Sequence, residues 1–96
     1  MNEQINEIKS RIEGTLQKHG VRKAALFGSS VVRGELTEES DLDVLVEFKG
    51  RKSLLDLAGL KIDLEDVMKK RVDVLTYNSL HPLLRDRILR EQVQIL

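Results

Sequence analysis

The sequence predicts a small α/β fold, in which helices flank one mixed β-sheet in the order α-β-α-β-α-β-α. Two segments, 3–19 and 53–68, have apolar residues at the three- and four-residue steps of amphipathic helices. Short runs rich in β-branched and aliphatic residues predict the strands, at 21–27, 42–48 and 72–76. The 96 residues suffice for one domain, 1–96, with a small core.

The first helix and the first strand follow each other closely. The apolar stripe of the helix consists of Ile5, Ile8, Ile12 and Leu16. Gly20 is well placed to end this helix, because glycine readily adopts the left-handed conformation found there. The strand at 21–27 finishes with four apolar residues, which suits a central strand that is covered on both faces.

The remaining elements follow from local signals. A short helix or turn is expected at 30–36, before the strand at 42–48. Ser53 is a typical N-cap for the helix that runs to about Met68. After the strand at 72–76, residues 78–82 predict a turn, and Pro82 suits the first turn of a last helix.

Three carboxylates lie on the predicted strands. Asp41 and Asp43 are two residues apart, so both side chains point to the same face of their strand. Adjacent carboxylates repel each other, and a divalent cation removes that repulsion. Asp73 lies between two valines, where a lone acid is costly unless it is paired or binds a metal. We therefore predict a metal site; a solvated strand start and a salt bridge of Asp73 are the alternatives.

The segment between the first two strands has the composition of a phosphate-binding turn. Gly28 lets the backbone approach a phosphate closely, and the N–H groups that follow it can donate hydrogen bonds. Ser29 directly follows this glycine, and Ser30 is the alternative phosphate ligand. Arg33 is a candidate for a phosphate or partner contact, against the alternative of an ordinary surface arginine.

These motifs resemble the active site of the DNA-polymerase-beta-like nucleotidyltransferases, in which Gly-Ser precedes Asp-x-Asp and a third acid follows on a later strand. The chain is most similar to the minimal nucleotidyltransferase (MNT) group, the antitoxins paired with HEPN toxins. The similar segments are Phe27–Ser29, Arg33–Glu35, Glu39–Asp43, Lys70–Thr76 and Leu84–Glu91. Eleven residues separate Ser29 from Asp41, one more than the pattern has, so the motif serine is either Ser29 or Ser30.

The resemblance implies a function. Such an enzyme transfers AMP from ATP to a tyrosine hydroxyl of a cognate HEPN toxin and thereby silences the toxin. Asp41 and Asp43 would hold two Mg²⁺ ions, with Asp73 as the third metal ligand and as the residue that helps to deprotonate the attacking hydroxyl. Gly28 and the motif serine would bind the β- and γ-phosphates. The alternative is a non-catalytic antitoxin or nucleotide-binding module that neutralises its partner by complex formation.

Composition narrows the possible partners and the compartment. Sixteen basic and sixteen acidic residues give a net charge of zero, which argues against nucleic acid as the main substrate. The absence of cysteine excludes disulfides and zinc–thiolate sites. No apolar run approaches the ~20 residues of a membrane span, and the polar N-terminus resembles no signal peptide. We therefore expect a cytoplasmic protein. The resemblance to the MNT group implies that it forms a hetero-oligomer with its toxin.

Overall fold

The computed structural model describes residues 3–28 and 41–96 of the chain. The elements in chain order are α1 (Glu3–Lys18), β1 (Val21–Phe27), β2 (Leu42–Phe48), α3 (Leu54–Met68), β3 (Val72–Thr76), a 3₁₀ turn η1 (Tyr77–Ser79), α4 (Pro82–Glu91) and β4 (Val93–Gln94). The predicted long helices, the last helix and the three strands are confirmed to within about two residues. The short helix or turn expected at 30–36 lies outside the described residues.

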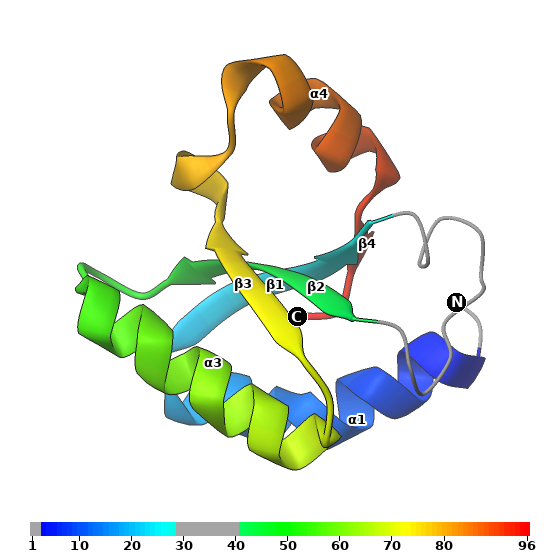
Figure 1. The fold of residues 1–96 in the computed structure, drawn as a ribbon, viewed down its shortest axis with the longest axis vertical. Helices are drawn as coiled ribbons and strands as arrows, with labels where there is room; N and C mark the ends of the chain where they lie inside the picture. Colours follow the sequence, from blue (N-terminus) through cyan, green and yellow to red (C-terminus); the bar gives the residue numbers. More distant parts are fainter. Residues whose placement is uncertain (1–2, 29–40) are drawn as a thin grey trace.

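The four strands form one mixed sheet in the order β3-β2-β1-β4 (Figure 1). β1 pairs antiparallel with both β2 and β4, whereas β2 and β3 run parallel and are connected through α3. The predicted mixed α/β fold is confirmed. The prediction for the C-terminal part was incomplete, because it contained the last helix but not the strand β4 that follows it. β4 has two residues, which pair with Ala25 and Leu26, and so short a strand has no detectable alternation of its own.

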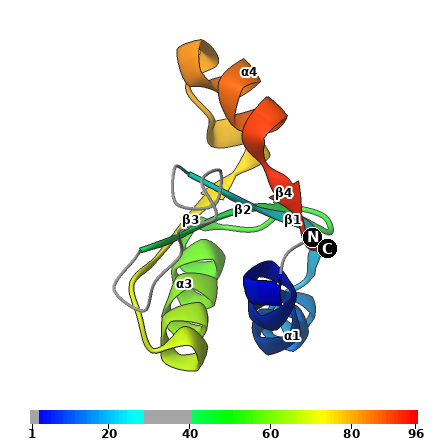
Figure 2. The ribbon, with the colours of Figure 1, turned by 90° about the vertical axis from the view of Figure 1, so that its right-hand side faces the viewer.

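The main core lies between the sheet and the pair α1 and α3, which cover the same face of the sheet (Figure 2). The helices bury their apolar stripes there, with Ile12, Leu16, Leu60 and Leu64 fully inaccessible to solvent. β2 and β3 contribute the valines that alternate with their acidic residues, namely Val44, Val46, Val72 and Val74. Because side chains alternate along a strand, the acidic residues must point to the opposite face.

The opposite face of the sheet carries a smaller core, over which α4 packs (Figure 2). Ala25 of β1, Leu45 of β2 and Leu80 are buried in it, and Ile88 and Leu89 of α4 pack against them. Leu45 is two residues from Asp43, so the face that carries Asp43 is the α4 face. At the amino-terminal ends of β2 and β3, the α4 face therefore carries the polar side chains of Asp43 and Asp73.

The start of α3 is fixed by its own side chains. Ser53 Oγ accepts a hydrogen bond from the Asp56 amide at 3.3 Å, and the Asp56 carboxylate accepts one from the Ser53 amide at 2.8 Å. This reciprocal capping box confirms Ser53 as the N-cap.

Within residues 3–28 and 41–96, no helix combines the length and the apolar character needed to cross a membrane.

Candidate active site

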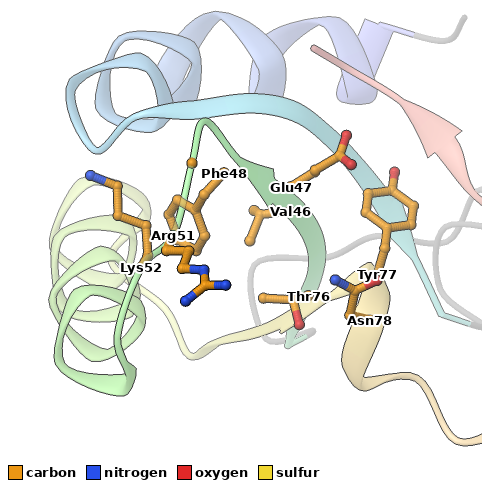
Figure 3. A pocket seen from close by; sticks show the side chains of 9 residues that line it. Val46, Glu47, Phe48, Arg51, Lys52, Thr76, Tyr77 and Asn78 are labelled. Carbon is orange, nitrogen blue, oxygen red and sulfur yellow. The ribbon is translucent and has the colours of Figure 1, made fainter.

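A shallow pocket of about 430 Å³ lies where β2 and β3 end, and it contains none of the predicted site residues (Figure 3). Its wall includes Glu47, Arg51, Tyr77 and Asn78. The tyrosine hydroxyl donates to Gln92 Oε1 at 2.9 Å and so joins η1 to the end of α4. Packing therefore accounts for Tyr77. The predicted acids Asp43 and Asp73 lie at the opposite ends of the two strands.

Two acids lie side by side at the amino-terminal ends of β2 and β3. The parallel register pairs Asp43 with Asp73, and both point to the α4 face. Neighbouring strands are about 4.8 Å apart, so the two carboxylates are within reach of one cation. Asp41 directly precedes β2 and is exposed. The structure thus brings together Asp43 and Asp73, with Asp41 two residues along the chain.

The surroundings of the Asp43 carboxyl disfavour its negative charge. Burial raises the pKa of its carboxyl above the usual 3.8, and the negative charges of Asp73 and Asp41 raise it further. Hard carboxylate oxygens are the ligands that Mg²⁺ prefers. A divalent cation would offset this repulsion, so the donor set fits the predicted metal.

Gly28 makes room for the Asp43 carboxylate. The β1–β2 register pairs Phe27 with Asp43, which places the following glycine close to the acid. The backbone φ of Gly28 is +103°, and a Cβ atom there would lie 2.5 Å from Asp43 Oδ2. Only glycine fits this position without displacing the acid. Ser29, Ser30 and Arg33, the other predicted phosphate contacts, lie outside the described residues.

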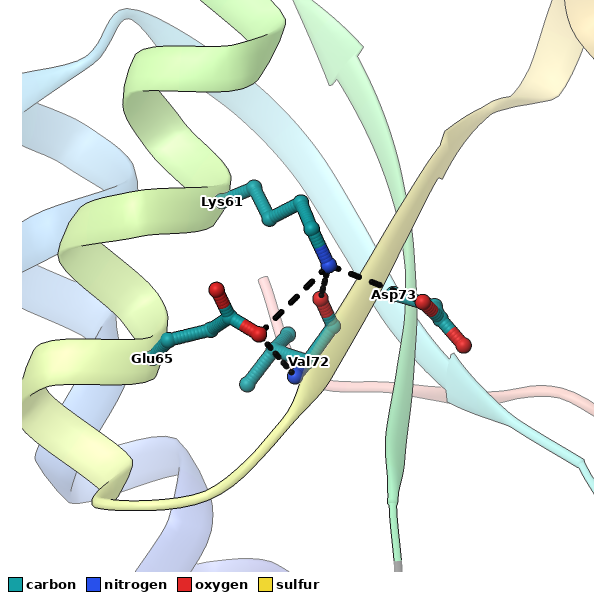
Figure 4. Close-up of polar contacts among 4 residues, drawn as sticks. All are labelled: Lys61, Glu65, Val72 and Asp73. Carbon is teal, nitrogen blue, oxygen red and sulfur yellow. Dashed lines mark hydrogen bonds and ion pairs between the residues drawn. The ribbon is translucent and has the colours of Figure 1, made fainter.

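Asp73 is engaged by a basic side chain from α3 (Figure 4). Lys61 Nζ lies 3.6 Å from Asp73 Oδ1, which is the salt bridge considered as the alternative role of this acid. The Asp73 side chain is still 52% exposed, so its carboxylate remains accessible. Among the described residues, no three acidic or histidine side chains are already arranged as a metal site. A metal bound by all three acids would therefore require their side chains to rearrange.

Sequence reasoning missed Lys61 and its neighbour Glu65. Glu65 Oε2 lies 3.5 Å from Lys61 Nζ and accepts a hydrogen bond from the Val72 amide at 3.1 Å. That amide, with Lys61, holds the pKa of Glu65 below its usual value. In the sequence the two residues are an ordinary i,i+4 pair on a helix, a pattern that gives no sign of a contact with β3.

Comparison with known proteins identifies the family. The polymerase beta nucleotidyltransferase family matches residues 10–96. The chain belongs to this family. A relative from Methanocaldococcus jannaschii, named as a protein adenylyltransferase, is 61% identical over 92 residues, which cover 96% of this chain and 98% of the relative. The predicted enzyme class, a protein adenylyltransferase, is thereby confirmed.

Solved structures of nucleotidyltransferases share the fold. A structure described as a minimal nucleotidyltransferase is 40% identical and superposes with a TM-score of 0.77, covering 95% of this chain and 92% of that one. A second chain, 17% identical with a TM-score of 0.73, comes from a complex of a tri-AMPylated Shewanella oneidensis HEPN toxin with an MNT antitoxin. The matched region covers 96% of this chain and 71% of the antitoxin-complex chain. The resemblance of this nucleotidyltransferase to the MNT group is confirmed.

Replacing Asp43 with asparagine should stabilise the metal-free protein at neutral pH. Because the folded pKa of Asp43 is raised above 3.8, the folded protein retains a proton that the unfolded chain has lost. The folded state therefore loses stability as pH rises through the raised pKa. Urea unfolding in EDTA should show Asp43→Asn more stable than wild type at pH 7, with the difference vanishing below pH 3.8.

The control for this experiment is Asp66→Asn on α3. Among the described residues, Asp66 has one exposed ion pair, with Lys69 at 3.6 Å, and such pairs contribute about 0–1 kcal/mol. Its substitution should change stability little at either pH. If Asp43→Asn were no more stable than wild type at pH 7, the inferred repulsion at the acid cluster would be wrong.

Proposed function

We propose that this nucleotidyltransferase uses Mg²⁺ to transfer AMP from ATP to a tyrosine hydroxyl of a cognate HEPN toxin, and so acts as its antitoxin. The observation that carries the proposal is the pairing of Asp43 with Asp73 beside Gly28. The family and the relatives named as protein adenylyltransferases support the reaction class. The HEPN toxin complex of a protein with this fold supports the type of partner.

The acids divide the work of the reaction. Asp41 and Asp43 would hold the metal ions and, through them, the triphosphate. Bound Mg²⁺ would neutralise charge on the phosphates and stabilise the attacking and leaving oxygens. Asp73, with its exposed carboxylate, would orient the tyrosine hydroxyl and help to remove its proton. The tyrosine oxygen forms a bond to the α-phosphorus of ATP, the bond from that phosphorus to pyrophosphate breaks, and pyrophosphate leaves.

The segment after β1 would hold the phosphates. The positive φ of Gly28 and the lack of a side chain there would allow the backbone to approach a phosphate closely. Ser29 or Ser30 would donate to the β- and γ-phosphates, and Arg33 would contact phosphate or the partner. The chain has one tyrosine, two phenylalanines and no tryptophan, so few rings are available to stack on the adenine base. Phosphate and metal contacts would therefore provide most of the affinity for ATP.

A second candidate function is neutralisation of the toxin by binding alone. Both functions require the same partner, but a protein that only binds has no physical need for repelling carboxylates on adjacent strands. Asp43 and Asp73 are such a pair on adjacent strands, and the charges of Asp73 and Asp41 add to the effect of burial in raising the pKa of Asp43. We therefore favour catalysis.

Asp73→Asn separates the two functions. The substitution is nearly isosteric and removes only an exposed ion pair, so the fold and the toxin complex should persist. Transfer of AMP should fall by roughly two orders of magnitude or more, the scale of lost general-base or metal assistance. Mass spectrometry of the toxin would measure transfer, and growth of cells that express both proteins would measure protection. Full protection by a variant that transfers no AMP would show that binding alone neutralises the toxin.

A further inference from the structure

Both polar backbone groups of Val72 are bound by side chains of α3 (Figure 4). Lys61 Nζ donates a hydrogen bond to the Val72 carbonyl at 2.6 Å, and the Val72 amide donates to Glu65 at 3.1 Å. The preceding residue, Arg71, instead accepts from the Leu42 amide at 3.0 Å, on the side of β2. Val72 therefore points its backbone groups to the free edge of β3, where a strand would otherwise lack partners.

This edge contact fixes the backbone immediately before Asp73. The same ammonium that binds the Val72 carbonyl also lies 3.6 Å from Asp73 Oδ1 and 3.5 Å from Glu65 Oε2. A lysine ammonium has three donors, and here three oxygens surround it. One side chain thus contacts both the backbone that carries the acid and the acid itself.

The charge of Lys61 matters because of the neighbouring acids. Asp73 is paired with Asp43 on the next strand, and their charges repel each other. Lys61 reaches Asp73 from α3, around the edge of β3 that faces away from Asp43. Its positive charge therefore offsets the repulsion on the third acid without occupying the space between the two strands.

We propose that Lys61 is a positioning residue for nucleotidyl transfer, which holds the backbone and the carboxylate of Asp73 in place for the reaction. This inference rests on the proposed function of the acids. Lys61 acts through Asp73 and does not contact the substrate. Glu65 has the supporting role of holding the Lys61 ammonium and the Val72 amide.

The test compares variants of Lys61 with a matched control. Lys61→Met keeps the apolar stem but removes the charge and the donors, whereas Lys61→Arg keeps the charge. We expect Lys61→Met to lower kcat about 10- to 100-fold, the usual effect of losing a side chain that orients a metal ligand. The KM for ATP should stay within about twofold of wild type, because losing an interaction made only in the transition state lowers kcat and kcat/KM equally. Lys61→Arg should recover most of the rate.

The control is Lys69→Met, which removes the exposed ion pair of Lys69 with Asp66 and should leave kcat unchanged. Glu65→Gln should have a smaller effect than Lys61→Met, because its amide oxygen can still accept from the Val72 amide. In amide NMR spectra of the metal-free protein, Lys61→Met should shift the Asp73 and Asp43 signals, and Lys69→Met should not. All assays are run well below the melting temperature of each variant.

The outcomes distinguish this inference from the proposed function. No transfer by the wild-type protein would refute the proposed function itself. If the wild type transfers AMP, the inference on Lys61 is overturned by an unchanged kcat in Lys61→Met or by an equal loss in Lys69→Met. A loss that disappears when the assay is cooled would also overturn it, since Lys61 would then only stabilise the fold.

Discussion

Replacing both Asp41 and Asp43 with asparagine is expected to lower AMP transfer by at least about 10³-fold. A bound metal contributes several kcal/mol of transition-state stabilisation, and each 1.36 kcal/mol changes the rate tenfold. The wild-type melting temperature should rise when Mg²⁺ or Mn²⁺ is added with ATP, since a ligand that binds only the folded state stabilises it. The double variant should show neither transfer nor this rise.

The same variant also tests whether lost activity reflects lost structure. Asp41 is exposed and the Asp43 carboxylate is destabilised by burial and by its acidic neighbours, so the metal-free double variant should be at least as stable as wild type. Thermal unfolding in EDTA measures this directly. An unchanged nucleotide-dependent rise in the double variant would refute the assignment of these acids to the metal.

Gly28→Val should abolish transfer and destabilise the protein. A Cβ atom at this position would lie 2.5 Å from Asp43 Oδ2, and the backbone φ of +103° is strained for any side chain. Backbone strain of this kind costs about 1–3 kcal/mol, and the displaced acid can no longer hold a metal. Gly28→Ala should have the same effect to a lesser degree. Transfer assays and urea unfolding would measure the two consequences separately.

The matched control is Gly14→Ala, a substitution within α1. A Cβ atom at Gly14 would have no neighbour within 4 Å. Because alanine favours the helix, the variant should gain about 0.5–1 kcal/mol of stability and keep full activity. If Gly28→Val retained wild-type transfer, the proximity of this glycine to Asp43 would have no functional role.

Local patterns in the sequence predicted most of the fold. The i, i+2 spacing of Asp41 and Asp43 predicts one shared strand face, because side chains alternate along a strand. In the structure Asp43 lies on β2 and Asp41 directly precedes it, so the shared face stays a prediction. The pairing of Asp43 with Asp73 depends on the register between β2 and β3, which no local pattern specifies. β4 was not predicted, because it is defined by its pairing with β1, which lies far from it in the sequence.

The candidate site was predicted less completely than the fold. The motif spacing of the residue types identifies Asp41, Asp43, Asp73 and Gly28 as candidates. Lys61 and Glu65 have the spacing of an ordinary helical ion pair, and their contacts with β3 exist only because α3 packs along that strand. The closeness of Gly28 to Asp43 likewise follows from the antiparallel register of β1 and β2. The roles of Ser29, Ser30 and Arg33 stay predictions.

The most direct test of catalysis by this acid cluster is mass spectrometry of the cognate HEPN toxin after incubation with the protein, ATP and Mg²⁺. We expect the mass of the toxin to rise by one or more AMP groups, attached to tyrosine. The modification should be absent when EDTA is added or when Asp41→Asn/Asp43→Asn replaces the wild-type protein. An unmodified toxin that the wild-type protein still neutralises would contradict the account, and so would equal modification by the double variant.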